Sequence, residues 1–168
     1  MTQKLQLTKP SRLSSGDTIA IVSPSSGLAN LVPHRVEKGV DALKSMGFQV
    51  VFAPHALERD GYISASAEKR ASDLHWAFSN PLIKAVICAI GGEHSNQILK
   101  YLDFSIIKNN PKIFVGYSDI SVLHFAFHSL GLITFYGPSL LTQFGEYPEV
   151  LDYTKKHFLA AVSKAEPI

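Results

Sequence analysis

The chain has no pair of cysteines and no cluster of basic residues. Its 168 residues contain one cysteine, and 16 lysines and arginines against 14 aspartates and glutamates leave a net charge of +2. A single cysteine excludes a disulfide within the chain. No basic block is longer than Lys155-Lys156, so the sequence has no electrostatic footprint for nucleic acid or for an anionic membrane, and we expect neither as a partner.

Long apolar runs are also missing. No stretch approaches the roughly 18 apolar residues that a membrane-spanning helix requires. The amino terminus, Met1–Leu7, has neither a continuous apolar run nor a small-residue cleavage site, so we expect no signal peptide and a cytoplasmic protein. A hydrophobic content of 46% with 18% charged residues excludes a disordered or fibrous class. The length predicts one domain, residues 1–168.

Apolar runs of strand length alternate with segments in which apolar residues repeat at helical spacing. The expected strands are 18–23, 48–52, 85–90, 112–115 and 132–136, and the expected helices are 36–46, 65–78, 95–102, 118–130 and 150–162. This alternation predicts an α/β fold with an open, mainly parallel sheet and helices on both faces, flavodoxin-like or class I glutamine-amidotransferase-like.

Polar residues and glycines follow three of the expected strands. They form the segments Ser23–Gly27, Gly91–Asn96 and Gly116–Asp119. In an open α/β sheet, ligands bind at the carboxyl ends of the strands, and parallel strands bring these ends to one edge. We therefore expect the three segments to meet in a single site.

Ser118 lies at the junction of a predicted strand and a predicted helix, and two interpretations are open. As the residue that caps the helix, it would stabilise the helix by roughly 1 kcal/mol. As a nucleophile, it would be presented on a tight strand-to-helix turn with its hydroxyl exposed. The capping interpretation does not explain the glycine at Gly116.

The pair Gly91-Gly92 is open to two interpretations as well. Glycines accept positive φ angles at no cost, so the pair could be only a turn. Alternatively, residues without side chains let a backbone amide approach a substrate carbonyl, and an amide here beside that of Asp119 would form a two-donor oxyanion hole.

The sequence supplies no complete catalytic triad. His94 lies beside the glycines, but no carboxylate is paired with it. His124 and His128 are four residues apart, as in a metal-binding helix, but no glutamate lies between them as in the metalloprotease motif. We therefore predict no metal and no cofactor. Cys88, inside an apolar run, is expected to be a small buried residue.

Five sequence blocks, in this order, carry a resemblance to a known family. They are Gly16–Ser26, Ile90–Gly92, Leu102-Asp103, Pro111–Ile120 and Thr134–Pro138. They resemble the amino-terminal half of the LD-carboxypeptidase family of serine peptidases, which includes muramoyl-tetrapeptide carboxypeptidases and microcin C self-immunity peptidases. The blocks are spread over most of the chain, from residue 16 to residue 138, so the resemblance is specific.

The resemblance assigns roles to individual residues. It implies that Ser118 is the nucleophile and that the amides of Asp119 and Gly92 form the oxyanion hole. Further residues matched to substrate binding or to the frame of the site are Gly91, Ser23, Ser25, Tyr117 and Tyr136. In this family the Glu and His that complete the triad come from a separate carboxy-terminal domain, which we expect to be missing here. The chain alone is then expected to be nearly inactive.

One departure from the family pattern concerns the substrate. The resemblance implies that murein-recycling members follow the double glycine with an aromatic residue and, a few positions on, an arginine suited to a substrate carboxylate. This chain has Glu93-His94-Ser95-Asn96 and no arginine there. It is more similar to the microcin-immunity branch, which implies an aminoacyl or peptidyl nucleotide as substrate.

Three hypotheses remain at this point. The first is the amino-terminal domain of a cytoplasmic serine peptidase, acting on a small peptide or peptidyl nucleotide, with a murein tetrapeptide as the alternative substrate. The second is a non-catalytic binding domain left by truncation. The third, a single-domain esterase with His94 as the base, is the weakest. Truncation would expose apolar residues at the sheet edge and tail, or cover them in a homodimer.

Overall fold

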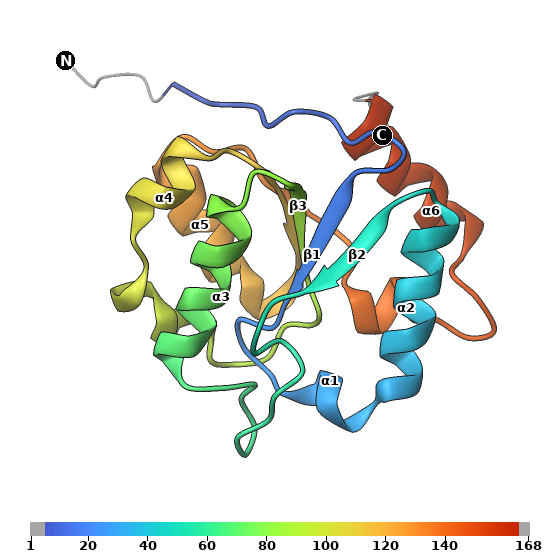
Figure 1. Cartoon of the computed structure of the whole chain (residues 1–168), viewed down its shortest axis with the longest axis horizontal. Helices are drawn as coiled ribbons and strands as arrows, with labels where there is room; N and C mark the ends of the chain where they lie inside the picture. Colours follow the sequence, from blue (N-terminus) through green and yellow to red (C-terminus); the bar gives the residue numbers. More distant parts are fainter. Residues whose placement is uncertain (1–5, 165–168) are drawn as a thin grey trace.

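The computed structural model describes residues 6–164 (Figure 1). Residues 1–5, which hold most of the segment considered for a signal peptide, lie outside the described part. No helix within residues 6–164 combines the length and the apolar character needed to cross a bilayer.

Five parallel strands form one sheet, which confirms the predicted fold class. Their order is β2-β1-β3-β4-β5. The strands are β1 (Thr18–Val22), β2 (Gln49–Phe52), β3 (Ile83–Cys88), β4 (Ile113–Gly116) and β5 (Phe135–Tyr136). The order reverses between β1 and β3, and such a switch point leaves a crevice at the carboxyl ends of these two strands.

Helices cover both faces of the sheet (Figure 1). One face carries α2 (Pro33–Ser45), the π-helical turn η3 (Leu140–Phe144), α6 (Asp152–Leu159) and its continuation η4 (Ala160–Lys164). The other face carries α3 (Ala67–Ser79), α4 (Phe104–Asn109) and α5 (Ser121–Ser129). The remaining short elements are α1 (Leu28–Leu31) and the 3₁₀ helices η1 (Ser95–Tyr101) and η2 (Ser118–Ile120).

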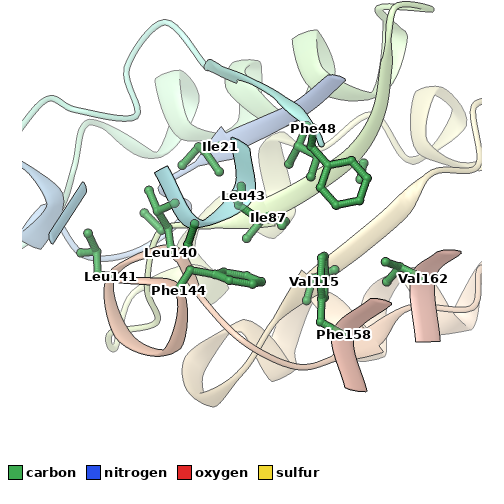
Figure 2. Close-up of a cluster of buried hydrophobic side chains, with 14 of the residues drawn as sticks. Ile21, Leu43, Phe48, Ile87, Val115, Leu140, Leu141, Phe144, Phe158 and Val162 are labelled. Atoms are coloured by element: carbon green, nitrogen blue, oxygen red, sulfur yellow. The ribbon is translucent and has the colours of Figure 1, made fainter. Parts of the chain in front are cut away.

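Alternate residues of the central strands supply the two halves of the core. Ile21 and Ile87 point to the face shown in Figure 2, where they meet Leu43 and Phe158 from the helices. Their sequence neighbours enter the opposite cluster, which includes Cys88. Burial of one such large apolar side chain contributes about 1.5–3 kcal/mol. Since both faces are covered, the central strands must be apolar throughout, and this is the pattern that the sequence displays.

Several local features of the structure differ from the expectation, among them a strand, a helix and a helix start. The fifth strand is only two residues long, because Leu132 forms a single bridge to Thr8 instead of pairing with β4. Helix α4 was not predicted; its signal is Asp103, whose carboxylate accepts a hydrogen bond from the Ser105 amide and caps the helix. The helix expected over 118–130 begins as η2 and becomes α-helical only at residue 121.

Candidate active site

The three predicted segments meet at one edge of the sheet, as expected. They line an open cavity of about 630 Å³. The loop after β1 contributes Ser26, the loop after β3 contributes Gly91, Gly92 and His94, and the turn after β4 contributes Ser118. The cavity therefore lies over the switch point between β1 and β3 and extends to β4.

Ser118 has the backbone conformation of a strained turn. Its φ of 63° is the only positive value at a non-glycine residue within residues 6–164, and such strain persists where the surrounding structure enforces it. The residue is exposed, and its side chain makes no capping bond to either helix that follows. The capping interpretation is therefore wrong. Its amide donates instead to the Tyr136 hydroxyl at 3.2 Å.

The double glycine packs directly against this turn. A Cβ on Gly91 would lie 3.1 Å from the Ser118 Cβ and 3.3 Å from the Asp119 amide nitrogen. Gly92 has a φ of +150°, and a Cβ there would lie 2.4 Å from the Ser25 hydroxyl oxygen. Neither position has room for a side chain. Within residues 6–164 neither the Gly92 amide nor the Asp119 amide donates a hydrogen bond, so both are available to a ligand.

The Asp119 carboxylate ties the three segments together. Its Oδ2 accepts hydrogen bonds from the Ser25 hydroxyl at 2.6 Å and from the amides of His94 and Ser95, both at 2.9 Å. Burial would raise the pKa of Asp119, but the hydrogen bonds from Ser25, Ser95 and His94 outweigh it and hold the pKa below its usual value. This carboxylate is therefore an ionised anchor. From the sequence, only the amide of Asp119 was predicted to have a role.

The two serines predicted to bind substrate, Ser23 and Ser25, are both buried. The Ser23 hydroxyl donates to the Ala56 carbonyl at 2.7 Å and the Ser25 hydroxyl donates to Asp119 at 2.6 Å. Neither lines the 630 Å³ cavity. The structure places these hydroxyls in the supporting framework of the site.

The two tyrosines predicted at the site lie on its other flank. The rings of Tyr117 and Tyr136 pack edge to face, with centroids 6.3 Å apart. Both line a second, largely apolar cavity of about 570 Å³ between β5 and α6. Tyr136 is 68% exposed, and Leu151 and Tyr153 in the tail are also exposed. Exposed apolar residues at the sheet edge and tail were expected, and the structure confirms them.

Within residues 6–164 no histidine or carboxylate is hydrogen-bonded to the Ser118 hydroxyl. His94 lines the same cavity, but its ring hydrogen-bonds neither to Ser118 nor to a carboxylate there. Both ring nitrogens of His124 already have hydrogen-bond partners: Nε2 lies 2.9 Å from the Gly116 carbonyl oxygen and Nδ1 lies 2.8 Å from the Thr134 hydroxyl. Residues 6–164 contain no group of three or more side chains arranged to hold a metal ion.

His124 predicts a pH dependence of stability. A carbonyl only accepts, so Nε2 carries a proton, and in the neutral ring Nδ1 accepts from the Thr134 hydroxyl. Burial lowers the pKa of His124, and its bond to Gly116 offsets this only in part. As the pH falls, the unfolded chain binds this proton before the folded chain does. The contribution of His124 to the free energy of unfolding is therefore fully present above about pH 6.5 and decreases as the pH falls below that value.

Urea unfolding at a series of pH values tests this prediction. We expect His124→Gln, which can still donate to Gly116, to lose less stability than the native chain as the pH falls below about 6.5. His75→Gln is the comparison: burial also lowers the pKa of His75, but its Nε2 accepts from the Asp103 amide instead of contacting Gly116. Parallel pH curves for His124→Gln and the native chain would contradict the prediction.

Comparison with known proteins gives one consistent result. Residues 19–137 match the LD-carboxypeptidase N-terminal domain. The putative carboxypeptidase YocD of Bacillus subtilis is 40% identical over 158 residues, which are 94% of this chain and 48% of that protein. The probable murein peptide carboxypeptidase of the same organism is 39% identical, over 82% of this chain and 42% of that protein.

The microcin C7 self-immunity protein MccF of Escherichia coli is similar in both sequence and structure. It is 36% identical over 92% of this chain and 45% of its own length. Its ligand-free wild-type structure matches with a TM-score of 0.88, over 92% of this chain and 46% of that one. MccF has also been solved in complex with aspartyl sulfamoyl adenosine.

This chain spans slightly less than half the length of these three relatives. The family match covers all five strands except the first residue of β1, together with the three loops that form the cavity. With the relatives at 36–40% identity, it shows that the chain belongs to the LD-carboxypeptidase family and corresponds to its N-terminal domain.

Proposed function

We propose that the chain is the nucleophile-bearing domain of a serine carboxypeptidase or amidase that hydrolyses an amide bond through an acyl-enzyme. The observation that carries this proposal is the geometry at Ser118: a strained, exposed serine lies beside two unpaired amides, those of Gly92 and Asp119. A free hydroxyl with two amides available to an oxyanion is the arrangement that acyl transfer requires.

In this mechanism the Ser118 oxygen attacks the carbonyl carbon of the scissile amide. The carbonyl oxygen becomes an oxyanion and accepts hydrogen bonds from the Gly92 and Asp119 amides. The serine proton passes to a histidine oriented by a glutamate and then to the departing amine. Water hydrolyses the resulting ester and regenerates the serine. The histidine and glutamate belong, in this proposal, to a separate carboxy-terminal domain.

We propose an aminoacyl or peptidyl nucleotide as the substrate. The segment Glu93–Asn96 offers no arginine for a substrate carboxylate, and the similar protein MccF binds aspartyl sulfamoyl adenosine. The alternative is a muramoyl tetrapeptide, which the similarity to a probable murein peptide carboxypeptidase supports. A side-by-side assay of an aminoacyl sulfamoyl adenosine and a muramoyl tetrapeptide separates the two substrates.

The chain alone is expected to turn over neither substrate, because no base is hydrogen-bonded to the Ser118 hydroxyl within residues 6–164. The measurement is hydrolysis by purified 168-residue chain, compared with the same chain continued by a carboxy-terminal domain, here called the two-domain protein. A rate near 10 per second, typical of enzymes, from the chain alone would disprove an external base. Loss of that rate in His94→Ala would then identify a single-domain esterase.

A second candidate function is a non-catalytic binding domain. One observation favours it: within residues 6–164 no base is hydrogen-bonded to Ser118. The reading frame after Ile168 discriminates between the two functions, since a stop codon supports the binding domain and a continuation carrying Glu and His supports the enzyme.

A homodimer and a cytoplasmic location are further parts of our proposal. The exposed Tyr136, Leu151 and Tyr153 support the homodimer, and light scattering that shows only monomer would exclude it.

A further inference from the structure

Arg70, on α3, is among the largest fully buried side chains of the described residues. No carboxylate within residues 6–164 forms an ion pair with it. Burial lowers the pKa of Arg70, while the attraction of Asp119 and Glu68 acts in the opposite direction. An arginine nonetheless keeps its proton at neutral pH. A buried cation is costly unless its donors are satisfied, so its contacts indicate why it is there.

The guanidinium of Arg70 connects the two loops that border the crevice. Its Nη1 donates to the Pro24 carbonyl at 2.8 Å, in the loop after β1, and to the His94 carbonyl at 3.0 Å, in the loop after β3. Its Nη2 donates to the Gln97 side chain at 2.7 Å, and its Nε donates to the Ala65 carbonyl at 2.8 Å. One planar group thus fixes both sides of the switch point.

His94 is held from both of its backbone groups. Its amide donates to Asp119 Oδ2 at 2.9 Å, and its carbonyl accepts from Arg70. Gly92 lies two residues earlier, with an unpaired amide and a backbone conformation that only glycine adopts easily. The direction of the Gly92 amide therefore depends on how firmly the following residues are anchored.

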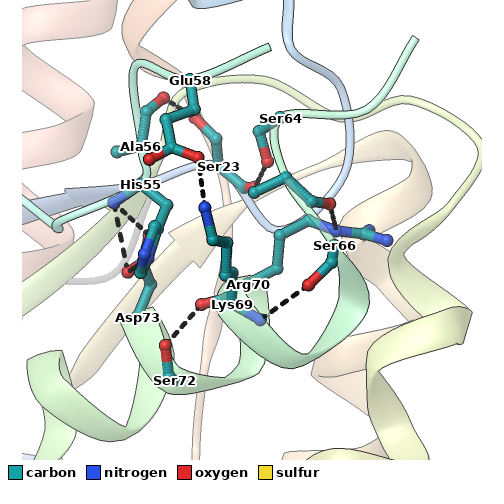
Figure 3. A network of polar contacts seen from close by, with 11 residues as sticks. Ser23, His55, Ala56, Glu58, Ser64, Ser66, Lys69, Arg70, Ser72 and Asp73 are labelled. Carbon is teal, nitrogen blue, oxygen red and sulfur yellow. Dashed lines mark hydrogen bonds and ion pairs between the residues drawn. The ribbon is translucent and has the colours of Figure 1, made fainter. Parts of the chain in front are cut away.

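We propose that Arg70 is a positioning residue that holds the segment Gly91–Ser95 so that the Gly92 amide faces the carbonyl attacked by Ser118. This inference rests on the proposed function. Arg70 reaches no substrate itself and acts through the loop carbonyls. Figure 3 shows that it leaves α3 in a different direction from its neighbour Lys69, which pairs with Glu58 at the surface.

The role needs the shape of arginine as well as its charge. A rigid, planar fork can donate to several acceptors that lie in different directions, whereas the lysine ammonium is a compact point charge on a flexible stem. Arg70→Lys therefore keeps the cation but cannot reach the carbonyls of Ala65, Pro24 and His94 together. Arg70→Met removes the charge and keeps an unbranched side chain.

Lys112 offers a matched control. It is also a buried cation that donates to backbone carbonyls, those of Ala77 and Asn80 at the end of α3. It precedes β4, at the amino-terminal edge of the sheet and opposite the cavity. Lys112→Met thus removes a comparable buried cation without touching the site.

Amide hydrogen exchange in the 168-residue chain is the first test. In Arg70→Met we expect the His94 and Ser95 amides, which both donate to Asp119, to exchange faster by about 10-fold or more. The amides of β1 and β3 should change far less, because a segment can open locally without unfolding of the whole domain. Lys112→Met is expected to leave Gly91–Ser95 unchanged. If Arg70→Met does not fold, Arg70→Lys gives the same comparison with a smaller expected effect.

Kinetics of the two-domain protein are the second test. We expect Arg70→Met to lower kcat by about 100-fold with KM changed less than about threefold, since a displaced oxyanion donor affects the transition state more than substrate binding. Arg70→Lys should lie between Arg70→Met and the native protein. Lys112→Met should change kcat and KM by less than about threefold.

Two results would overturn the inference. One is faster exchange by an equal factor across the whole sheet in Arg70→Met, which would mean a purely global stabilising role. The other is an unchanged kcat despite faster local exchange. Full activity of Ser118→Ala would instead overturn the proposed function, and the exchange comparison would still decide whether Arg70 orders the segment.

Discussion

Replacement of Ser118 by alanine is expected to lower kcat/KM of the two-domain protein by about 10⁴- to 10⁶-fold. The hydroxyl is exposed in the cavity beside the unpaired Gly92 and Asp119 amides, and the proposed acyl-enzyme cannot form without it. Residual hydrolysis would come from substrate binding and the oxyanion hole alone. The measurement is steady-state hydrolysis, with mass spectrometry to detect an acyl adduct on the native serine.

Ser129→Ala is the matched control for this substitution. Ser129 is another exposed serine, at the far end of α5, and its hydroxyl donates only to the Ala126 carbonyl within its own helix. We expect it to keep native activity. A Ser118→Ala variant within about tenfold of the native rate would rule out covalent catalysis at this residue.

Gly92→Ala is expected to lower kcat by about 100-fold, because it should displace one of the two oxyanion donors. The added Cβ would lie 2.4 Å from the Ser25 hydroxyl and 3.1 Å from the Ser26 amide nitrogen. Since Ser25 also anchors Asp119, the clash would spread to the turn that carries Ser118. The strained backbone should also lower the free energy of unfolding by about 1–3 kcal/mol.

The control for this variant separates backbone strain from the clash. Gly16 also has a positive φ, +89°, but a Cβ there would meet nothing within 4 Å, and it precedes β1 at the opposite edge of the sheet. Gly16→Ala should lose stability but keep native kcat. Equal kcat values for the Gly92→Ala and native proteins would show that this amide does not bind the oxyanion.

The sheet and the general position of the site could be predicted from the sequence because both depend on local patterns. A strand covered on two faces must be apolar throughout, as Ile83–Cys88 nearly is. Polar segments that follow such strands must then share an edge. The length of β5 was overestimated, because the residues before Phe135 have the composition of a strand. In the structure they pair with no neighbouring strand of the sheet.

The supporting network could not be predicted, because its bonds join residues that are distant in sequence. Arg70 donates to a carbonyl 46 residues away and Ser25 to a carboxylate 94 residues away. One signal was available. Arg70 lies in helical register with Leu74 and Ala77, both buried, so a charged residue occupies the inward face of α3, where it needs a specific set of acceptors.

The long sequence separation between Ser25 and Asp119 also determines when the site can form during synthesis of the chain. The cost of closing a loop grows with its length, and the bond between these residues closes 94 residues of chain. The loop after β1 leaves the ribosome long before its carboxylate partner does. The nucleophile and its oxyanion donors therefore come together only after β4 has joined the sheet. A nascent chain that ends before β4 therefore cannot hold the Ser118 turn beside the Gly92 amide, whatever part of the sheet it has already formed.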